Sequence, residues 1–426
     1  EPGNSVISAD GPAGGGTVTL GSANTRAAQV DNGAIVRADA TNLGDGGTIS
    51  VRATFDSVPA SGGPVPRSTF GVADVYGTLL ARGGPNGGNG GRIETSGTAL
   101  NTSLQFPDNP AVIAATIDAR AQAATGLAGT WTIDPYDVAI TNGATVAVNG
   151  AFNPTGPGAN VRAADIATAL NGGTSVEITT GTAAIGSAAG DITLGAQTAI
   201  TRTAGAAPTT LTLRAHGNVV LAGGSSIGVA GGAGPVNVNL LSDLDGNGSG
   251  AVLLQGASIT TGGGNATLSG GVDPATGFAS AGAQSPGVHL QGSTINTGAG
   301  AARGDVVLRG TSAGATASAA LQTGVLINNG SAIDARNISI NGQAGASTAV
   351  QISGSRIATD SGLVQLHGVA TRNLTTTGRA IGVDLGFGTN ISAGTGSVLI
   401  AGRGDENGAR TWLAQAAAAP READWS

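Results

Sequence analysis

Oxygen-bearing side chains occur at alternate positions in the segment Asp243-Leu-Asp245-Gly-Asn247-Gly. This spacing begins calcium-binding loops, in which alternate oxygens converge on a hard cation. The bidentate Glu that closes such a loop is missing, because the twelfth position counted from Asp243 is Leu254. Two interpretations stay open: a weak calcium site formed by Asp243, Asp245 and Asn247, or a plain polar turn. We expect no other cofactor.

Two Arg-Gly-Asp tripeptides occur, at Arg303-Gly304-Asp305 and at Arg403-Gly404-Asp405. Host integrins can bind such tripeptides, so both are candidate binding sites. Gly190-Asp191 also precedes an apolar strand segment, but without an Arg before it. The pair Gly-Asp is therefore also typical of a strand-entry turn in this sequence.

Catalytic constellations are sparse. Hydrolysis of a polysaccharide would need paired carboxylates on neighbouring strands, and a lyase would need a base together with clustered carboxylates. His289 and His367 lie on predicted strands without an evident acidic or Ser partner in the same repeat, and His216 lies beside a turn. We therefore expect a protein that is not an enzyme.

The elements that would carry these residues follow a repeat that returns seven times in the second half of the chain. Each copy has a strand with alternating apolar residues, then an Ile seven or eight residues after the strand start, then a second such strand. The first strands start at Ile192, Val219, Val252, Val288, Val325, Val350 and Val383. The following Ile residues are Ile200, Ile227, Ile259, Ile295, Ile333, Ile357 and Ile391. The second strands begin near Leu211, Val236, Ala266, Val306, Ile338, Val364 and Val398.

Strands this short cannot bury a core alone, but stacked coils can pair each strand with its equivalents above and below. The repeat therefore predicts an all-β, right-handed parallel β-helix with Gly at its corners. A short helix is predicted at 163–170, where apolar residues recur at helical spacing before Asn171-Gly172-Gly173.

The expected organisation has four parts. Residues 1–142 form irregular coils, with strands near 16–20, 34–37, 48–51, 78–80 and 92–95. Residues 143–175 connect them, through the short helix, to regular coils at 176–410. Residues 411–426 form a tail that either caps the last coil through Trp412 and Leu413 or is disordered.

The composition excludes several classes of function. Of the 426 residues 75 are Gly, 40% are hydrophobic and 11% are charged, and the formal net charge is −7. A nucleic-acid partner is not expected, because phosphate binding requires a basic face. Cys is absent, which excludes disulfides and thiol chemistry. No apolar run is long enough for a membrane span.

The chain resembles the filamentous-haemagglutinin-like exoproteins of two-partner secretion in Gram-negative bacteria. The resemblance lies in Gly83-Gly-Pro-Asn-Gly-Gly-Asn-Gly-Gly-Arg-Ile-Glu-Thr-Ser-Gly97, in Gly129-Thr-Trp-Thr-Ile-Asp-Pro-Tyr-Asp-Val-Ala-Ile140 and in the stretches 165–180 and 190–194 that follow. It implies a β-helical passenger that leaves the cell through an outer-membrane secretion pore. The Asn-Pro-Asn-type motifs of the family's secretion domain do not occur, and Asn153-Pro154 is the nearest approach. We expect a passenger segment without its secretion domain.

The sequence thus predicts an extracellular or bacterial cell-surface stalk that serves adhesion to a host cell, a neighbouring cell or matrix. The first alternative is a structural filament in which chains join end to end. The second is a β-helical enzyme acting on polysaccharide. End-to-end association would favour the filament, and turnover of a polysaccharide would favour the enzyme.

Overall fold

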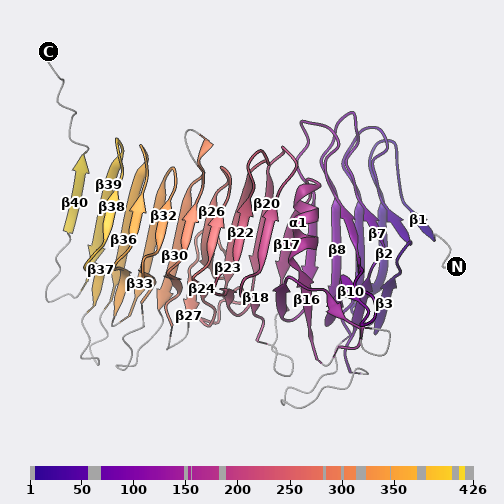
Figure 1. Ribbon diagram of the computed structural model, residues 1–426, viewed down its shortest axis with the longest axis horizontal. Helices are drawn as coiled ribbons and strands as arrows, with labels where there is room; N and C mark the ends of the chain where they lie inside the picture. Colours follow the sequence, from indigo (N-terminus) through magenta and orange to yellow (C-terminus); the bar gives the residue numbers. More distant parts are fainter. Residues whose placement is uncertain are drawn as a thin grey trace. The chain divides into compact units, whose positions relative to one another are not determined.

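The computed structural model describes residues 5–55, 69–147, 152–154, 156–181, 189–281, 285–298, 302–312, 323–345, 347–371, 380–404 and, as a strand only, 412–417. The chain forms two compact units, Glu1–Leu240 and Leu241–Ser426. Each unit is a stack of parallel β-coils, and its strands lie side by side in Figure 1. The predicted parallel β-helix is confirmed. The strand β23 (Val236–Ser242) contains the boundary between the units.

The coils of the N-terminal unit have three sides, which are formed mainly by strands. The first side runs β2 (Thr17–Ser22), β5 (Thr48–Ala53), β8 (Arg92–Gly97), β13 (Thr130–Asp134), β17 (Ser175–Thr179) and β20 (Thr209–Arg214). The second runs β3 (Ala27–Val30), β6 (Val72–Val75), β9 (Ala99–Asn101), β16 (Gly158–Arg162), β14 (Val138–Thr141), β18 (Ile192–Leu194) and β21 (Val219–Leu221). The third has β1 (Val6–Ser8), β4 (Ile35–Arg37), β7 (Thr78–Leu80) and β12 (Thr116–Asp118), and then separately β19 (Ala199–Arg202) and β22 (Ser226–Val229). The strands β10 (Ser103–Gln105), β11 (Val112–Ala114) and β15 (Thr145–Val146) form a small additional sheet.

The second unit repeats the three sides more regularly. Its first side runs β26 (Ala266–Gly270), β30 (Val306–Ser312), β33 (Ile338–Ala344), β36 (Leu363–Ala370), β39 (Ser397–Arg403) and β40 (Trp412–Ala417), and β27 (Ala279–Ala281) also pairs with β30. The second runs β24 (Val252–Gln255), β28 (Val288–Gln291), β31 (Val325–Asn328), β34 (Thr348–Ile352) and β37 (Ile381–Leu385). The third runs β25 (Ser258–Thr260), β29 (Thr294–Asn296), β32 (Ala332–Asp334), β35 (Arg356–Ala358) and β38 (Asn390–Ser392).

The register of these sheets matches the repeat. Val288 pairs with Val325, and Val325 with Val350. On the third side Ile333 pairs with Ile357. Equivalent residues of successive copies therefore lie directly above one another, as the spacing predicts.

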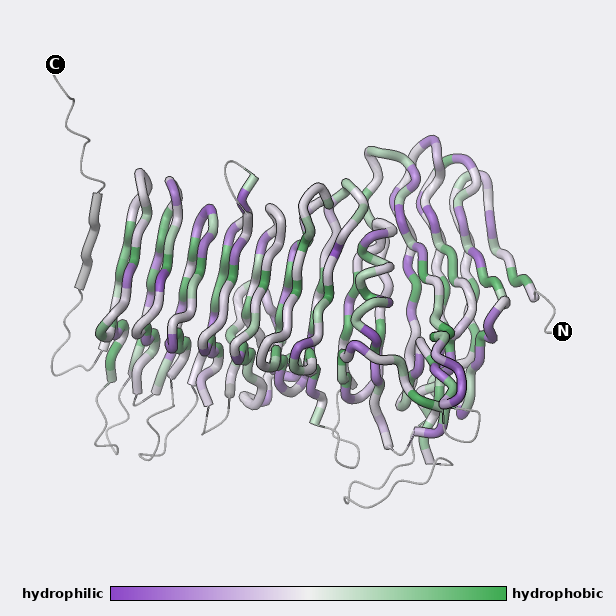
Figure 2. Tube along the Cα trace, in the orientation of Figure 1, coloured by the Kyte–Doolittle hydropathy of each residue, from purple (hydrophilic) through white to green (hydrophobic). Residues whose placement is uncertain are grey.

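The core of each coil comes from alternate residues. In β33 the burial pattern alternates between buried and half-buried positions, with Ile338 and Ile340 facing inward. Figure 2 shows the same alternation of hydrophobic and hydrophilic residues along the strands of both units. Inward apolar rows hold neighbouring coils together because each coil buries the apolar surface of the next.

The predicted helix is confirmed as α1 (Ala163–Asn171), and Gly172 and Gly173 follow it. It buries Ala163, Ile166, Ala169 and Leu170 on one face. The helix lies between β16 of the second side and β17 of the first, and it contacts β12 and β19. It therefore occupies the place of a third-side strand, which divides that side into two sheets.

Two features of the connections differ from a simple stack. The strand β16 follows β14 in sequence but lies between β9 and β14 in the second-side sheet. At the other end of the chain, β40 pairs antiparallel with β39, with Gly402 opposite Trp412. A strand therefore covers the last coil of the second unit.

The coil corners require Gly for close approach. A Cβ built on Gly91 would overlap the backbone carbonyls of Gly47 and Ala81. Since Gly47 and Gly91 begin equivalent strands of neighbouring coils, a side chain at this corner would push the coils apart.

Candidate functional site

A group of outward polar side chains lies on the first side of the N-terminal unit. Outward means that these residues alternate with the buried core residues Ile93, Trp131 and Ile133. In one register row lie Ser50, Glu94, Thr132, Glu177 and Thr212. In the next row Arg52, Ser96 and Asp134 lie beside one another, and Arg214 is two residues beyond Thr212. Three acidic residues, Glu94, Asp134 and Glu177, lie in these two adjacent rows, and we call them together the acidic row.

One buried hydroxyl connects two members of the acidic row. The Ser96 Oγ donates to Glu94 Oε1 at 3.0 Å and lies 3.5 Å from Asp134 Oδ2. Ser50 Oγ donates to the other Glu94 oxygen, Oε2, at 3.3 Å. The carboxylates of two neighbouring coils are thus held around a single Ser side chain.

This proximity changes the protonation of Asp134. Burial, and then the negative charge of Glu94, raise the pKa of Asp134 to about 6. The Arg52 guanidinium and the Ser96 hydrogen bond act in the opposite direction, and Glu177 adds a smaller repulsion. An excess of negative charge therefore collects between β8 and β13.

Thr132 places an unused hydroxyl in the same group. The residue is 5% exposed, and within the described part of the chain its Oγ1 has no hydrogen-bond partner. Its Cα partners are Glu94 on one side and Glu177 on the other. At the edge of the group, Arg214 Nη1 lies 3.9 Å from Glu177 Oε1.

The acidic row was not predicted from the sequence, because Glu94, Asp134 and Glu177 all precede the seven regular copies, which begin at Ile192. The available signal was the alternation in Arg92-Ile-Glu-Thr95 and Thr130-Trp-Thr-Ile-Asp134, which places both carboxylates on the outward face. What the sequence does not contain is the pairing of β8 with β13, which brings Glu94 beside Thr132.

The predicted calcium residues Asp243, Asp245 and Asn247 form hydrogen bonds within their own turn. Asp243 Oδ1 accepts hydrogen bonds from the backbone N–H groups of Gly248 and Ser249, and the Asp245 carboxylate accepts two from Asn247. Each oxygen group closes a local turn, as in the second interpretation of this segment. Across the described ranges, no group of three or more His, Cys, Asp or Glu residues is arranged to hold a metal ion.

The first Arg-Gly-Asp tripeptide is engaged in the fold. The Arg303 side chain is 5% exposed and forms ion pairs with Asp334 and Asp360. The Asp305 carboxylate accepts hydrogen bonds from Arg336 and Asn337, which lowers the pKa of Asp305. Both charged groups therefore have partners within the fold, and Gly304-Asp305 directly precedes β30.

The second tripeptide is described in part. Arg403 is exposed at the end of β39, and Gly404 follows it. Asp405 lies outside the described residues.

The three histidines lie at separate places. His289 Nε2 lies 3.3 Å from Asn328 Oδ1, and burial lowers the pKa of His289. His216 is buried beside Thr180, and His367 is exposed on β36. The structure does not bring these side chains together.

Fold and surface together define a parallel β-helical repeat protein with polar outward faces. Comparison with protein-family models and with the curated proteins finds no match to this chain. In the described part of the chain, no helix is long and apolar enough to cross a membrane.

Proposed function

We propose that this chain is a non-enzymatic, secreted or surface-displayed β-helical stalk that serves adhesion to cells or matrix. Its export through an outer-membrane secretion pore rests on the resemblance to filamentous-haemagglutinin-like exoproteins. One observation carries the adhesive role: successive coils stack in register, so that outward side chains repeat in rows along each unit.

The repetition of outward side chains along the stack provides a physical mechanism for adhesion. The outward positions of β30, β33 and β36 carry mainly polar or singly charged side chains, such as Ser339 and Gln365, which share one row with Val307. Such contacts are weak individually, and no aromatic anchor stands among these three. Affinity then depends on several equivalent patches binding at once.

The test compares the same chain as a monomer and as a cluster. Monomer binding to cells and to immobilised polysaccharide is measured by surface plasmon resonance, and bead-coupled chains are scored for adhesion to the same targets. We expect weak monomer binding, strong bead adhesion and little dependence on salt. A tight, salt-sensitive, one-to-one complex of the monomer contradicts the proposal.

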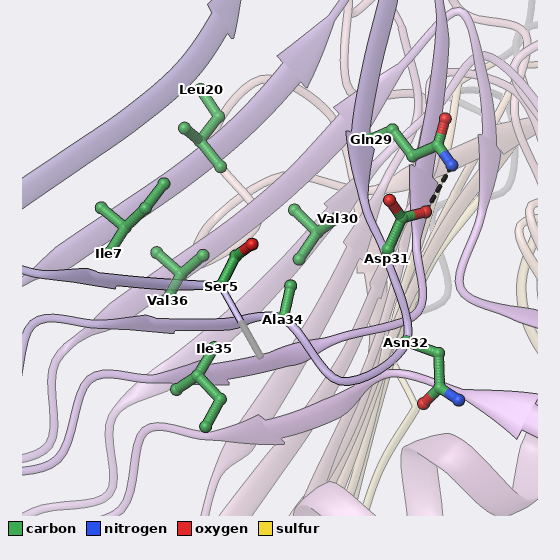
Figure 3. Close-up of a pocket in the computed structure, with 10 residues that line it drawn as sticks. All are labelled: Ser5, Ile7, Leu20, Gln29, Val30, Asp31, Asn32, Ala34, Ile35 and Val36. Atoms are coloured by element: carbon green, nitrogen blue, oxygen red, sulfur yellow. Dashed lines mark hydrogen bonds between the residues drawn. The ribbon is translucent and has the colours of Figure 1, made fainter. Parts of the chain in front are cut away.

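A structural filament is the second candidate, and the first coil of the N-terminal unit favours it. Within the described ranges, β1, β2 and β3 are the outermost strands of their sheets. Val6 is 54% and Ile7 is 44% exposed. A cavity of about 360 Å³ opens beside them, and Figure 3 shows the apolar side chains of Ile7, Leu20 and Val36 along it. Free strand edges with apolar neighbours promote pairing with another chain.

If chains associate through β1, oligomer formation should be sensitive to a charge placed on this strand. Ile7→Lys should reduce oligomer formation in light scattering, because a charge on an edge strand opposes strand addition. Leu127→Lys, at a 73% exposed position elsewhere in the same unit, is the matched control. Equal oligomer formation by Ile7→Lys and the unmodified chain contradicts assembly through β1.

The enzyme alternative would use the carboxylates of Glu94 and Asp134. Hydrolysis requires a substrate bond between two such groups, whereas here the Ser96 hydroxyl lies between them. Polysaccharide turnover that is lost in Glu94→Gln would establish the enzyme and contradict the proposal.

A further inference from the structure

Carboxylate oxygens of Glu94 and Asp134 lie on either side of the Ser96 hydroxyl, between β8 and β13. Ser96 Oγ lies 3.0 Å from Glu94 Oε1 and 3.5 Å from Asp134 Oδ2. Ca²⁺ binds oxygens at about 2.3–2.6 Å, so neighbouring ligands at right angles are about 3.4 Å apart. The Ser96 hydroxyl thus lies near such a separation from one carboxylate oxygen of each of two neighbouring coils.

Thr132 supplies an independent indication of a ligand. The residue is 5% exposed, its hydroxyl has no hydrogen-bond partner among the described residues, and it occupies the register position between Glu94 and Glu177. Buried hydroxyls are normally satisfied by protein, water or ion. Here the hydroxyl lies on the same outward face as Asp134, two residues before it on β13.

We propose that Glu94, Asp134, Ser96 and Thr132 form a Ca²⁺ site that clamps two neighbouring coils of the N-terminal unit. All four donors are oxygens, as a hard cation requires. The site is separate from the turn that begins at Asp243, whose carboxylate already closes a local turn.

The surrounding charges determine its strength. Glu177 adds negative charge from β17, whereas Arg52 on β5 and Arg214 on β20 oppose a cation. With two carboxylates in the shell and water completing it, we expect a dissociation constant of about 10⁻⁴–10⁻³ M, the range of extracellular calcium modules.

The test titrates CaCl₂ into the full chain by isothermal calorimetry, after chelator treatment. We expect one saturable site. Glu94→Gln and Asp134→Asn should each weaken binding about tenfold or more, and Thr132→Val should weaken it measurably while keeping the side-chain shape. Arg52→Gln should tighten binding, since it removes an opposing charge. Asp245→Asn, in the turn predicted from sequence, is the control and should leave binding unchanged.

Three outcomes overturn the proposal: no saturable heat at about 10 mM CaCl₂, which is well above the expected dissociation constant; binding that survives both carboxylate substitutions; or binding that is lost in Asp245→Asn. Far-ultraviolet circular dichroism establishes that each variant is folded. If Glu94→Gln does not fold, the Asp134→Asn, Thr132→Val and Arg52→Gln titrations decide the question.

Discussion

Two aspartate side chains of this protein, Asp305 and Asp134, lie in environments that shift their pKa values in opposite directions. Asp305, which enters β30, accepts hydrogen bonds from Arg336 and Asn337, and these hold its pKa below the usual range. Asp134, at the end of β13, is largely buried next to Glu94, and its pKa rises. The first environment stabilises the charged carboxylate, and the second opposes it.

The lowered pKa of Asp305 predicts a pH-dependent stability. A carboxylate with a depressed folded pKa contributes stability that is present above its unfolded pKa of about 3.9 and is lost as the pH falls through the folded value. Asp305→Asn should therefore reduce the stability of the second unit near neutral pH and flatten its acid dependence below about pH 4. Urea unfolding at a series of pH values measures both effects.

Arg336→Gln provides the matching test of the cause. The Arg336 side-chain hydrogen bond is the largest influence on the pKa of Asp305. Removing it should reproduce part of the flattening. An unchanged acid profile in both variants would show that this pair does not contribute to acid unfolding.

Ile333 tests the inward row of the second unit. It is 0% exposed and stacks between Ile295 and Ile357. Ile333→Asp would bury an unpaired charge and should lower the free energy of unfolding by about 4 kcal/mol or more. Ile333→Val should cost only about 0.5–1.5 kcal/mol. Thermal denaturation compares the two, and equal stability of Ile333→Asp and the unmodified chain would mean that this position does not face the core.

Among the elements, those with local signals could be predicted from the sequence. Alternation and Gly-rich turns were enough for strands such as β30 and β33, because each strand carries its own inward row. The helix α1 was evident from its 3.6-residue period and the following glycines. The seven-fold repeat then fixed which strands stack, since equivalent residues must lie in register.

What the sequence could not show are placements that depend on contacts between distant segments. Nothing local to 158–162 indicates that β16 inserts between β9 and β14. The acidic row has the same origin, because 38 residues along the chain separate Ser96 from Asp134 and only the β8–β13 register joins them. In the predicted calcium segment, the residue types were suitable, but the Asp243 carboxylate closes its own turn.

The close approach at the coil corner predicts that two glycines of the N-terminal unit differ in how much stability is lost on substitution by Ala. Gly91→Ala should destabilise the N-terminal unit by about 1–3 kcal/mol, because its Cβ would overlap backbone carbonyls of the preceding coil. Gly143→Ala should be close to neutral, since no atom lies within 4 Å of a Cβ built there. Chemical denaturation of the two variants measures the difference. Equal loss in both would contradict close approach at the corner.

For the molecule as a whole, the strand edges at the ends of the stacks matter most. At the C-terminal end the sequence left a cap and a disordered tail open. The structure places β40 antiparallel along β39, from Ser397 to Gly402. This pairing satisfies an edge that parallel coils leave free.

Removing residues 411–426 should therefore increase self-association. The deletion exposes the edge of β39, including Val398 and Ile400, to strand addition by another chain. Light scattering of the shortened and complete chains over a range of concentrations measures the effect. A shortened chain that stays monomeric at high concentration would show that β40 does not protect this edge.

The position of α1 has a consequence for how the N-terminal unit folds. On two sides a backbone ladder passes from coil to coil beyond the helix, through β13 to β17 and through β14 to β18. On the third side the ladder stops at β12 and resumes at β19. If the stack grows coil by coil, a new coil usually pairs with three strands of the coil before it. At α1 the next coil can pair with only two strands, β13 and β14. Propagation should be slowest at this step, and the coils before α1 can become ordered as a nucleus before those after it.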